Sequence, residues 1–220
     1  MLAAQTAQGT SKAPEAAAQI QITVERETTQ GWEVVNPAQV LESGTRLRFR
    51  FKSTFPGYLY LMNQGSSGAY QTVFPASDSG VDNRVEPDKE IIVPQTEGLF
   101  RLSGPSGYDV LYWVVAPTRW PAGSNATYRP LSAPPAPGSK LSSLTPRCDD
   151  STFRARGECV DLDAGLQKVD KPERLPSAVS QAPGLQARDL IFEKGKEVSV
   201  VKVPSRPNGP VVYEMRLAHK

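Results

Sequence analysis

The 220-residue chain has few side chains that could serve as a catalytic base. His219 is the only histidine and stands one residue from the C-terminus, where chains tend to fray. A Ser-His-Asp triad or a histidine zinc site would have to be built on it. The stretch 104–107 lacks the Lys-Ser/Thr of a phosphate loop and is interpreted as a turn. We expect His219 to be an exposed tail residue, and we expect no catalytic residue, no cofactor and no enzymatic activity.

Two groups of acidic residues offer the oxygen ligands that a hard cation prefers. The first lies in one loop that also contains Arg84 and Lys89, and its spacing fits no EF-hand: Asp78, Asp82, Asn83, Asp88. The second surrounds the cysteines and is mixed with Arg147, Arg154 and Arg156: Asp149, Asp150, Glu158, Asp161, Asp163. A solvated loop and local ion pairing explain these groups more simply than a metal. We predict no metal site, and cation binding by the 78–88 loop stays open.

Cys148 and Cys159 are the only cysteines, and they stand close together in a polar segment. They have neither the spacing of a redox site nor enough partners for zinc. Two free thiols in a reducing cytosol are the alternative, but neither cysteine has the apolar context typical of such thiols. A disulfide is the simplest use of the pair, and it persists only in an oxidising compartment. The first nineteen residues resemble what remains after an export signal is removed. We therefore predict a periplasmic or secreted protein.

Two features could contact a ligand directly. Arg46, Arg48 and Arg50, together with Lys52, alternate along one stretch and could meet a polyanion. Outward charges also protect a strand from edge pairing, which is the simpler interpretation. Trp120 and Tyr128, in a proline-rich stretch, could form a platform for a sugar ring or a proline-rich peptide, or could pin a long loop to the sheet.

The composition limits the class of protein. Twenty prolines and 17 glycines argue against a mostly helical fold, because proline breaks helix interiors. A net charge of +2 gives no general attraction to nucleic acid, so no nucleic-acid partner is expected. The longest apolar run, 110–116, is far too short for a transmembrane segment.

The elements that should position these candidate residues are β-strands. In 46–52 the apolar and charged residues alternate strictly, and 19–26 shows the same period of two with Ile20, Ile22 and Val24. Further short strands follow between turn residues: 32–35, 58–62, 70–74, 90–93, 99–102 and 110–116. This spacing predicts an all-β fold, an antiparallel β-sandwich of about eight to ten strands.

The late strands 197–203 and 211–217 are joined by a turn at Asn208-Gly209. Two strands alone are too few for a stable unit, so we expect both to complete the early sheet. The chain then divides into a flexible 1–18 and a single domain over 19–220. Its 117–186 part is a loop-rich, Pro-rich and disulfide-containing insertion, with a weak helical tendency at 161–168.

One pattern resembles a known family. Gly57-Tyr58-Leu59-Tyr60-Leu61, then Phe74-Pro75, then Gly104-Pro105-Ser106-Gly107 is similar to a bacterial family catalogued only as a domain of unknown function. The resemblance covers 40–117, about a third of the chain. It implies occurrence in envelope proteins or beside peptidase-like or kinase domains, and it carries over no catalytic residue. Tyr108-Asp109 replaces the acidic residue that usually follows soon after the second glycine, a small departure.

We therefore predict a non-catalytic, envelope-associated binding module with a protein or glycan partner. The alternative is a carbohydrate-active hydrolase or a glycan-binding accessory domain, in which two carboxylates such as Asp78, Asp82 or Glu86 face each other across a cleft. The identity of the ligand and the oligomeric state stay open.

Overall fold

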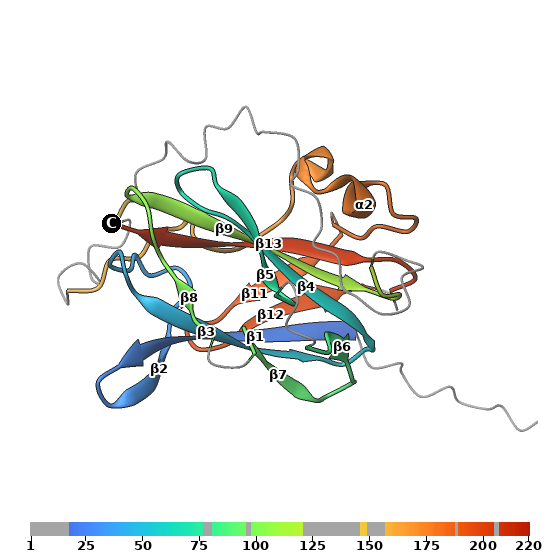
Figure 1. The fold of residues 1–220 in the computed structure, drawn as a ribbon, viewed down its shortest axis with the longest axis horizontal. Helices are drawn as coiled ribbons and strands as arrows, with labels where there is room; N and C mark the ends of the chain where they lie inside the picture. The colour runs from blue at the N-terminus through green and yellow to red at the C-terminus, as the bar shows by residue number, and fades with distance from the viewer. Residues whose placement is uncertain are drawn as a thin grey trace, which may run out of the picture.

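The computed structural model describes residues 18–76, 81–95, 98–120, 146–148, 157–187, 189–204 and 207–220. These residues form thirteen strands in two antiparallel sheets, several of the strands being only two or three residues long. Figure 1 shows the sheets packed face to face, with the short helices outside one of them. The predicted all-β sandwich is confirmed.

The first sheet has seven strands and carries the alternating segments found in the sequence. Inward residues such as Ile22 and Phe51 pair across β1 and β3 and are fully buried, while the residues between them point to solvent. The strands of its main path, in spatial order, are β11 (Ile191–Lys194), β12 (Ser199–Val203), β1 (Ala18–Thr28), β3 (Arg46–Ser53) and β7 (Glu90–Val93). Two further strands extend it, β2 (Gly31–Val35) beside β1 and β8 (Phe100–Arg101) beside β3.

The second sheet has six strands, and its two central strands are buried on both faces. These are β13 (Val211–His219) and β9 (Gly107–Ala116), which pair along their whole length. The main path runs β10 (Gly165–Gln167), β13, β9, β4 (Gly57–Gln64) and β5 (Tyr70–Phe74), and β6 (Arg84–Val85) pairs with the start of β4.

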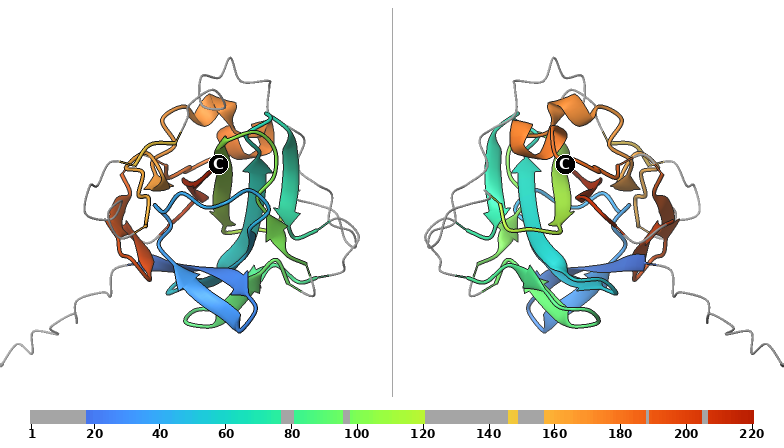
Figure 2. Two further views of the ribbon diagram at one scale, coloured as in Figure 1. Left: turned by 90° about the vertical axis from the view of Figure 1, so that its left-hand side faces the viewer. Right: turned by 90° about the vertical axis from the view of Figure 1, so that its right-hand side faces the viewer.

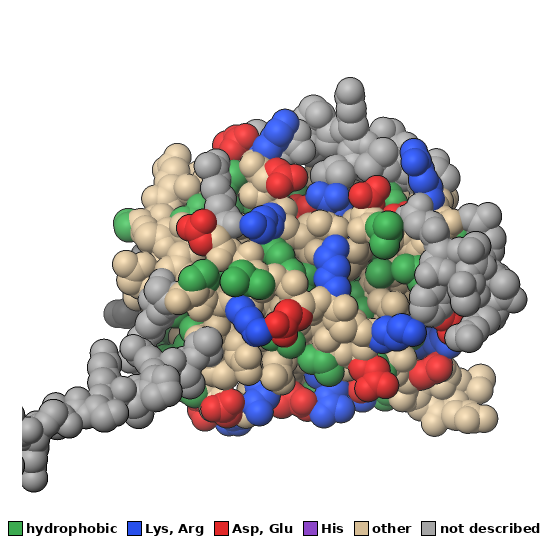
Figure 3. All heavy atoms as spheres, turned by 180° about the vertical axis from the view of Figure 1, so that it is seen from behind, with side chains coloured by type: hydrophobic (Ala, Val, Ile, Leu, Met, Phe, Trp, Pro, Cys, Tyr) green, Lys and Arg blue, Asp and Glu red, His purple; other side chains and the backbone are tan. Residues whose placement is uncertain are grey.

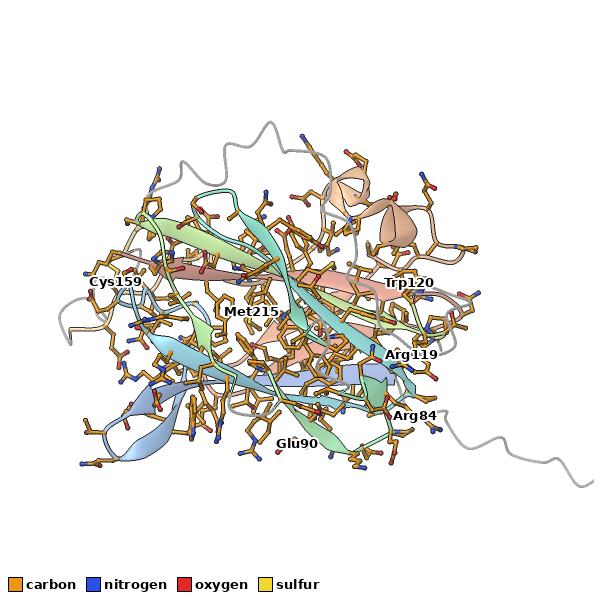
Figure 4. All side chains as sticks on the ribbon, viewed as in Figure 1. Arg84, Glu90, Arg119, Trp120, Cys159 and Met215 are labelled. Carbon is orange, nitrogen blue, oxygen red and sulfur yellow. A yellow bond between two sulfur atoms is a disulfide. The ribbon has the colours of Figure 1, made fainter. Side chains whose placement is uncertain are left out.

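The core lies between the two sheets and is centred on Trp113 of β9. Its ring stacks on Phe51 at 5.8 Å and on Tyr213 at 6.4 Å between centroids, and it meets Phe49 edge-on. Met215 of β13 lies in the same layer (Figure 4). Because both sheets contribute to this one cluster, removing either would expose the aromatic side chains of the other.

The outer face of the six-stranded sheet is also covered. The segment with η2 (Pro172–Arg174) and α2 (Ser177–Ser180) places Leu175 and Val179 on a second apolar cluster with Tyr60 and Val212. Figure 2 shows these helices on the side away from the seven-stranded sheet. Among the described residues, no helix has the length and apolar character needed to cross a membrane.

Two sequence expectations need correction. The late strands do not both complete the early sheet: β12 pairs with β1, whereas β13 crosses to the other sheet and pairs with β9. Burial explains this division, because β12 is buried only at alternate positions and β13 suits a central place. The tendency to helix at 161–168 was also wrong. Gly165 has a φ of +79°, outside the helical region, and begins β10.

Two glycines of the resemblance motif have structural reasons. A Cβ on Gly57 would lie 2.8 Å from Cγ1 of Val115 and 2.9 Å from the carbonyl oxygen of Ala116, so only glycine lets β4 start this close to β9. Gly104 has a φ of +101°, and a Cβ there would meet the Ser66 hydroxyl at 2.9 Å. The motif therefore specifies backbone packing.

Candidate functional site

The cationic face predicted at Arg46, Arg48, Arg50 and Lys52 lies on the outer side of β3, and each cation has a carboxylate nearby. The closest pairs are Arg46–Glu27 at 2.8 Å, Arg48–Glu25 at 2.5 Å, Arg50–Glu90 at 2.9 Å and Lys52–Asp88 at 3.7 Å. The guanidinium of Arg48 also lies 4.2 Å over the ring of Trp32.

These pairings neutralise the face. The hydrogen bond to Glu90 raises the pKa of Arg50 above its ordinary value, with the negative charge of Glu90 adding to the effect. Figure 3 shows basic and acidic side chains interspersed along the lower rim of the molecule. A polyanion would have to compete with carboxylates already in place. Because β3 lies between β1 and β7, its cations form an ion-paired outer face and do not protect a sheet edge, as the sequence had suggested they would.

Trp120 is held against the sheet by Tyr60. The two rings lie 6.0 Å apart, the Tyr60 hydroxyl donates to the Trp120 carbonyl oxygen at 3.0 Å, and it accepts from the Trp120 backbone N–H. Burial raises the pKa of Tyr60 above its ordinary value. Trp120 thus packs against the sheet, which is the geometry expected for the alternative to a ligand platform. Tyr128, its expected partner, lies outside the described residues.

Cys148 and Cys159 are joined as a disulfide, with their Cα atoms 4.8 Å apart. The carbonyl of Cys159 accepts from the N–H of Val40 at 2.7 Å, which ties the disulfide to the sandwich. Nearby, the buried carboxylate of Asp161 accepts from the N–H of Arg147 at 2.8 Å and from the Tyr108 hydroxyl. Asp161, one member of the predicted acidic cluster, therefore has a structural role.

His219 is not an exposed tail residue, and this prediction was wrong. It is fully buried at the end of β13, where it pairs with Gly107 of β9. The carbonyl oxygen of Leu41 accepts a hydrogen bond from the N–H of Lys220 at 3.1 Å, which holds the residue after β13 against the sandwich. Nε2 of His219 lies 3.8 Å from Oδ1 of Asp109. The same oxygen accepts a hydrogen bond from the N–H of Ser66 at 2.8 Å. Complete burial separates the imidazole from any substrate in solution.

The loop that could have bound a cation is bonded locally where it is described. Asn83 is buried and donates to the Leu59 carbonyl at 3.0 Å, and Asp82 accepts the N–H of Arg84 at 3.1 Å. Glu86 pairs with Lys89 at 3.5 Å, and Asp78 lies outside the described residues. Within the described ranges, no three metal-ligating side chains gather in one place.

A groove that sequence reasoning missed lies at one end of the sandwich. Its volume is about 300 Å³. Aromatic and proline side chains dominate its lining, which comprises Phe55, Pro56, Gly57, Tyr58, Arg84, Val85, Pro117 and Pro207. Phe55 and Val85 are buried, whereas Pro56, Pro117 and Arg84 are exposed. We call this set the proline groove.

The sheet register builds the proline groove. Tyr58 of β4 pairs with Arg84 of β6 on one side and with Ala116 of β9 on the other, so these residues form a row across the end of the sheet. Pro117 directly follows this row, and Pro207 comes from the connection between β12 and β13. The lining residues come from separate parts of the chain. The only sequence signal for the groove was the individual prolines at 56, 117 and 207.

Within the described residues, the arginines near the proline groove lack the carboxylate partners that the cations of β3 have. Neither Arg84 nor Arg119 forms an ion pair with a carboxylate of the described residues, and both are exposed. The charge of Arg119 reaches the Tyr60 hydroxyl, where it partly opposes the larger effect of burial on the pKa. Figure 4 shows both arginines with Trp120 at one end of the molecule and Cys159 at the opposite end.

Comparison with known proteins adds one family. Residues 40–119 match the model described as "Domain of unknown function (DUF4384)". The predicted similarity to a domain-of-unknown-function family is confirmed to that extent. The matched stretch includes β3, β4 and β9, with the motif glycines and all of the groove lining except Pro207. No curated protein matches the chain, and no solved structure matches it.

Proposed function

We propose that this chain is a non-catalytic module of the bacterial cell envelope that binds a protein partner, with the proline groove as its binding surface. The observation that carries the proposal is a groove with exposed proline walls beside the guanidinium of Arg84, which forms no ion pair with the carboxylates that the structure describes. Proline side chains lose no rotamer freedom when a partner docks, so the surface is organised before binding.

The size and lining of the groove favour a protein partner over a glycan. A volume of about 300 Å³ is at the small end for ligand pockets and suits a few inserted side chains. A sugar platform needs an exposed aromatic face. Trp120 is engaged with Tyr60, Phe55 is buried, and Tyr58, the remaining aromatic residue of the groove, is only half-buried and stands among prolines. The walls at Pro56 and Pro117 are instead exposed proline rings, with polar surface between them.

We propose no catalysis because the candidate catalytic side chains are either buried or already paired with other groups of the chain. His219 is fully buried inside the sandwich. Asp82 holds a backbone N–H and Glu86 holds Lys89, so each has a structural partner in its own loop. The envelope location is supported by the Cys148–Cys159 disulfide, since such bonds persist in oxidising compartments.

A paired array experiment tests the proposal. The labelled protein, a Tyr58→Ala variant and a Lys171→Gln control are applied to peptide and glycan arrays. Tyr58 lines the groove, whereas Lys171 is an exposed residue outside it. We expect peptide spots that bind the wild type and the control but not Tyr58→Ala. Binding confined to glycans, peptide binding unaffected by Tyr58→Ala, or turnover of any arrayed substrate would overturn the proposal.

A further inference from the structure

The proline groove has the chemistry of one class of peptide. We infer that its ligand is an acidic, proline-containing segment in the extended polyproline II conformation. This inference rests on the proposed function and specifies the partner of the same site. Three observations carry it: the nature of the walls, the charge of Arg84 and Arg119, which have no ion pair within the described ranges, and the contrast with the paired cations of β3.

The walls favour a polyproline II ligand over an added β-strand. A strand that extends a sheet needs a row of free N–H and C=O groups, and the prolines at 56, 117 and 207 have no N–H to offer. A polyproline II helix has no internal hydrogen bonds and presents its rings to flat apolar surfaces. Tyr58 and the adjacent prolines provide such surfaces. The Tyr58 hydroxyl and the Arg84 guanidinium can donate hydrogen bonds to the carbonyl oxygens of the ligand.

The charge of the groove selects an acidic ligand. Arg84 stands beside Tyr58 in the sheet register, and its guanidinium has no ion pair with any carboxylate in the described ranges. Arg119 extends the positive charge at the same end of the molecule (Figure 4). A guanidinium forms two parallel hydrogen bonds to a carboxylate, so an Asp or Glu between prolines satisfies it with defined geometry.

The contrast with β3 makes this charge informative. There Arg46, Arg48 and Arg50 each pair with a carboxylate of a neighbouring strand. The chain thus provides internal partners for the cations of β3 and none, among the described residues, for Arg84 and Arg119 at the groove. An acidic partner supplies the missing carboxylates.

The chain's own sequence provides matched probes. Residues 131–139, LSAPPAPGS, are rich in proline and carry no acidic residue. A fluorescein-labelled peptide of this sequence serves as the neutral probe. A second carries Ala133→Glu and Ala136→Glu, and a third keeps those two changes but replaces each proline with serine. The three peptides separate the contribution of charge from that of proline.

Fluorescence anisotropy with the full chain gives the readout. We expect the acidic proline peptide to bind at least about fivefold more tightly than either other peptide. Arg84→Gln should weaken it by about fivefold, Arg119→Gln by less, and Lys171→Gln should leave it unchanged. Raising the salt from about 50 to about 300 mM should also weaken it, because exposed ion pairs are screened. Thermal melts establish that each variant is folded.

Equal binding of the neutral and acidic peptides would overturn the role of charge, and equal binding of the serine peptide would overturn the polyproline II conformation. Acidic-peptide binding that survives Arg84→Gln would place the ligand elsewhere. If these peptides fail while array peptides still depend on Tyr58, only the ligand class is wrong. If no peptide binding depends on Tyr58, the proposed function itself fails.

Discussion

The two ends of the sandwich use their polar groups differently. At the Cys159 end, the carboxylates of Asp161 and Asp109 accept hydrogen bonds from the protein itself, and the main chain around Leu41 pairs with the end of β13. At the groove end, the walls are prolines, and the charge of Arg84 faces solvent without a described partner. The first arrangement stabilises the fold and the second leaves chemistry available to a ligand. We call these the tied end and the groove end.

The largest effect should come from removing the late strands, one of which connects both ends. Truncation after Val179 deletes β11, β12 and β13. In β13, Val211 pairs with Val115 near the groove and His219 pairs with Gly107 at the tied end. Because the deletion exposes the core aromatic residues and an unpaired edge of β9, we expect a fragment that aggregates and lacks a cooperative transition. Circular dichroism during thermal denaturation measures this. A cooperative melt like that of the full chain would disprove the single-domain interpretation.

Breaking the disulfide at the tied end should lower the stability of the fold without removing the binding surface at the groove end. The double variant Cys148→Ser with Cys159→Ser frees the chain between the two positions in the unfolded state. We expect a loss of about 2 to 3 kcal/mol in the free energy of unfolding, measured by urea titration. Binding of the acidic proline peptide should persist in conditions where the variant is still folded, since the groove lies at the other end. Loss of binding by the folded variant would show that the ends are coupled.

The same bond tests the compartment. Protein purified from its native host and alkylated without reduction should show no modified thiol by mass spectrometry, because the pair is oxidised outside the cytoplasm. Two alkylated cysteines would contradict both the bond and the envelope location.

Gly57→Ala should strain the base of the groove end. The new Cβ would meet Cγ1 of Val115 at 2.8 Å and the carbonyl oxygen of Ala116 at 2.9 Å, so β4 and β9 must separate slightly. We expect a loss of about 1.5 kcal/mol in stability. Gly98→Ala is the matched control, because its Cβ would have neighbours only at 3.4 Å or beyond. Equal stability of the two variants would show that the strand contact at Gly57 is not limiting.

Arg84→Gln should have the smallest effect on stability, within about 0.5 kcal/mol, because the side chain is exposed and has no described ion pair. Urea denaturation of this variant, compared with Arg48→Gln, sharpens the contrast. Arg48 contacts both Glu25 and Trp32, so its loss should destabilise the fold more. A larger loss for Arg84→Gln would reveal a structural role for the groove charge.

The strands were predictable because they depend on local alternation. The segment 46–52 alternates so regularly that its inward and outward faces follow directly from the sequence, and β3 has that burial pattern. The sheet to which a strand belongs depends on distant partners instead, and for this reason β13 was wrongly grouped with β12. His219 was misjudged because its place was inferred from the chain end, whereas its environment is set by Leu41 and β9.

The site was less predictable than the fold. The carboxylate partners of Arg48 and Arg50 stand 23 and 40 residues away in the sequence, so their neutralising effect could not be read from the alternation alone. The walls of the proline groove combine Pro56, Pro117 and Pro207, three residues of separate loops that are individually ordinary. Their convergence depends on the register of β6, β4 and β9.

The place of β13 also determines when the second sheet can close during synthesis. β9 ends at Ala116, but its partner begins at Val211, and at a translation rate of about 5 to 20 residues per second the delay is on the order of ten seconds. Throughout that interval the nascent chain keeps one edge of β9 and the aromatic side of the core unpaired. The second sheet of a polypeptide with this strand order closes only after β13 has been synthesised, and until then its core aromatic side chains are open to aggregation.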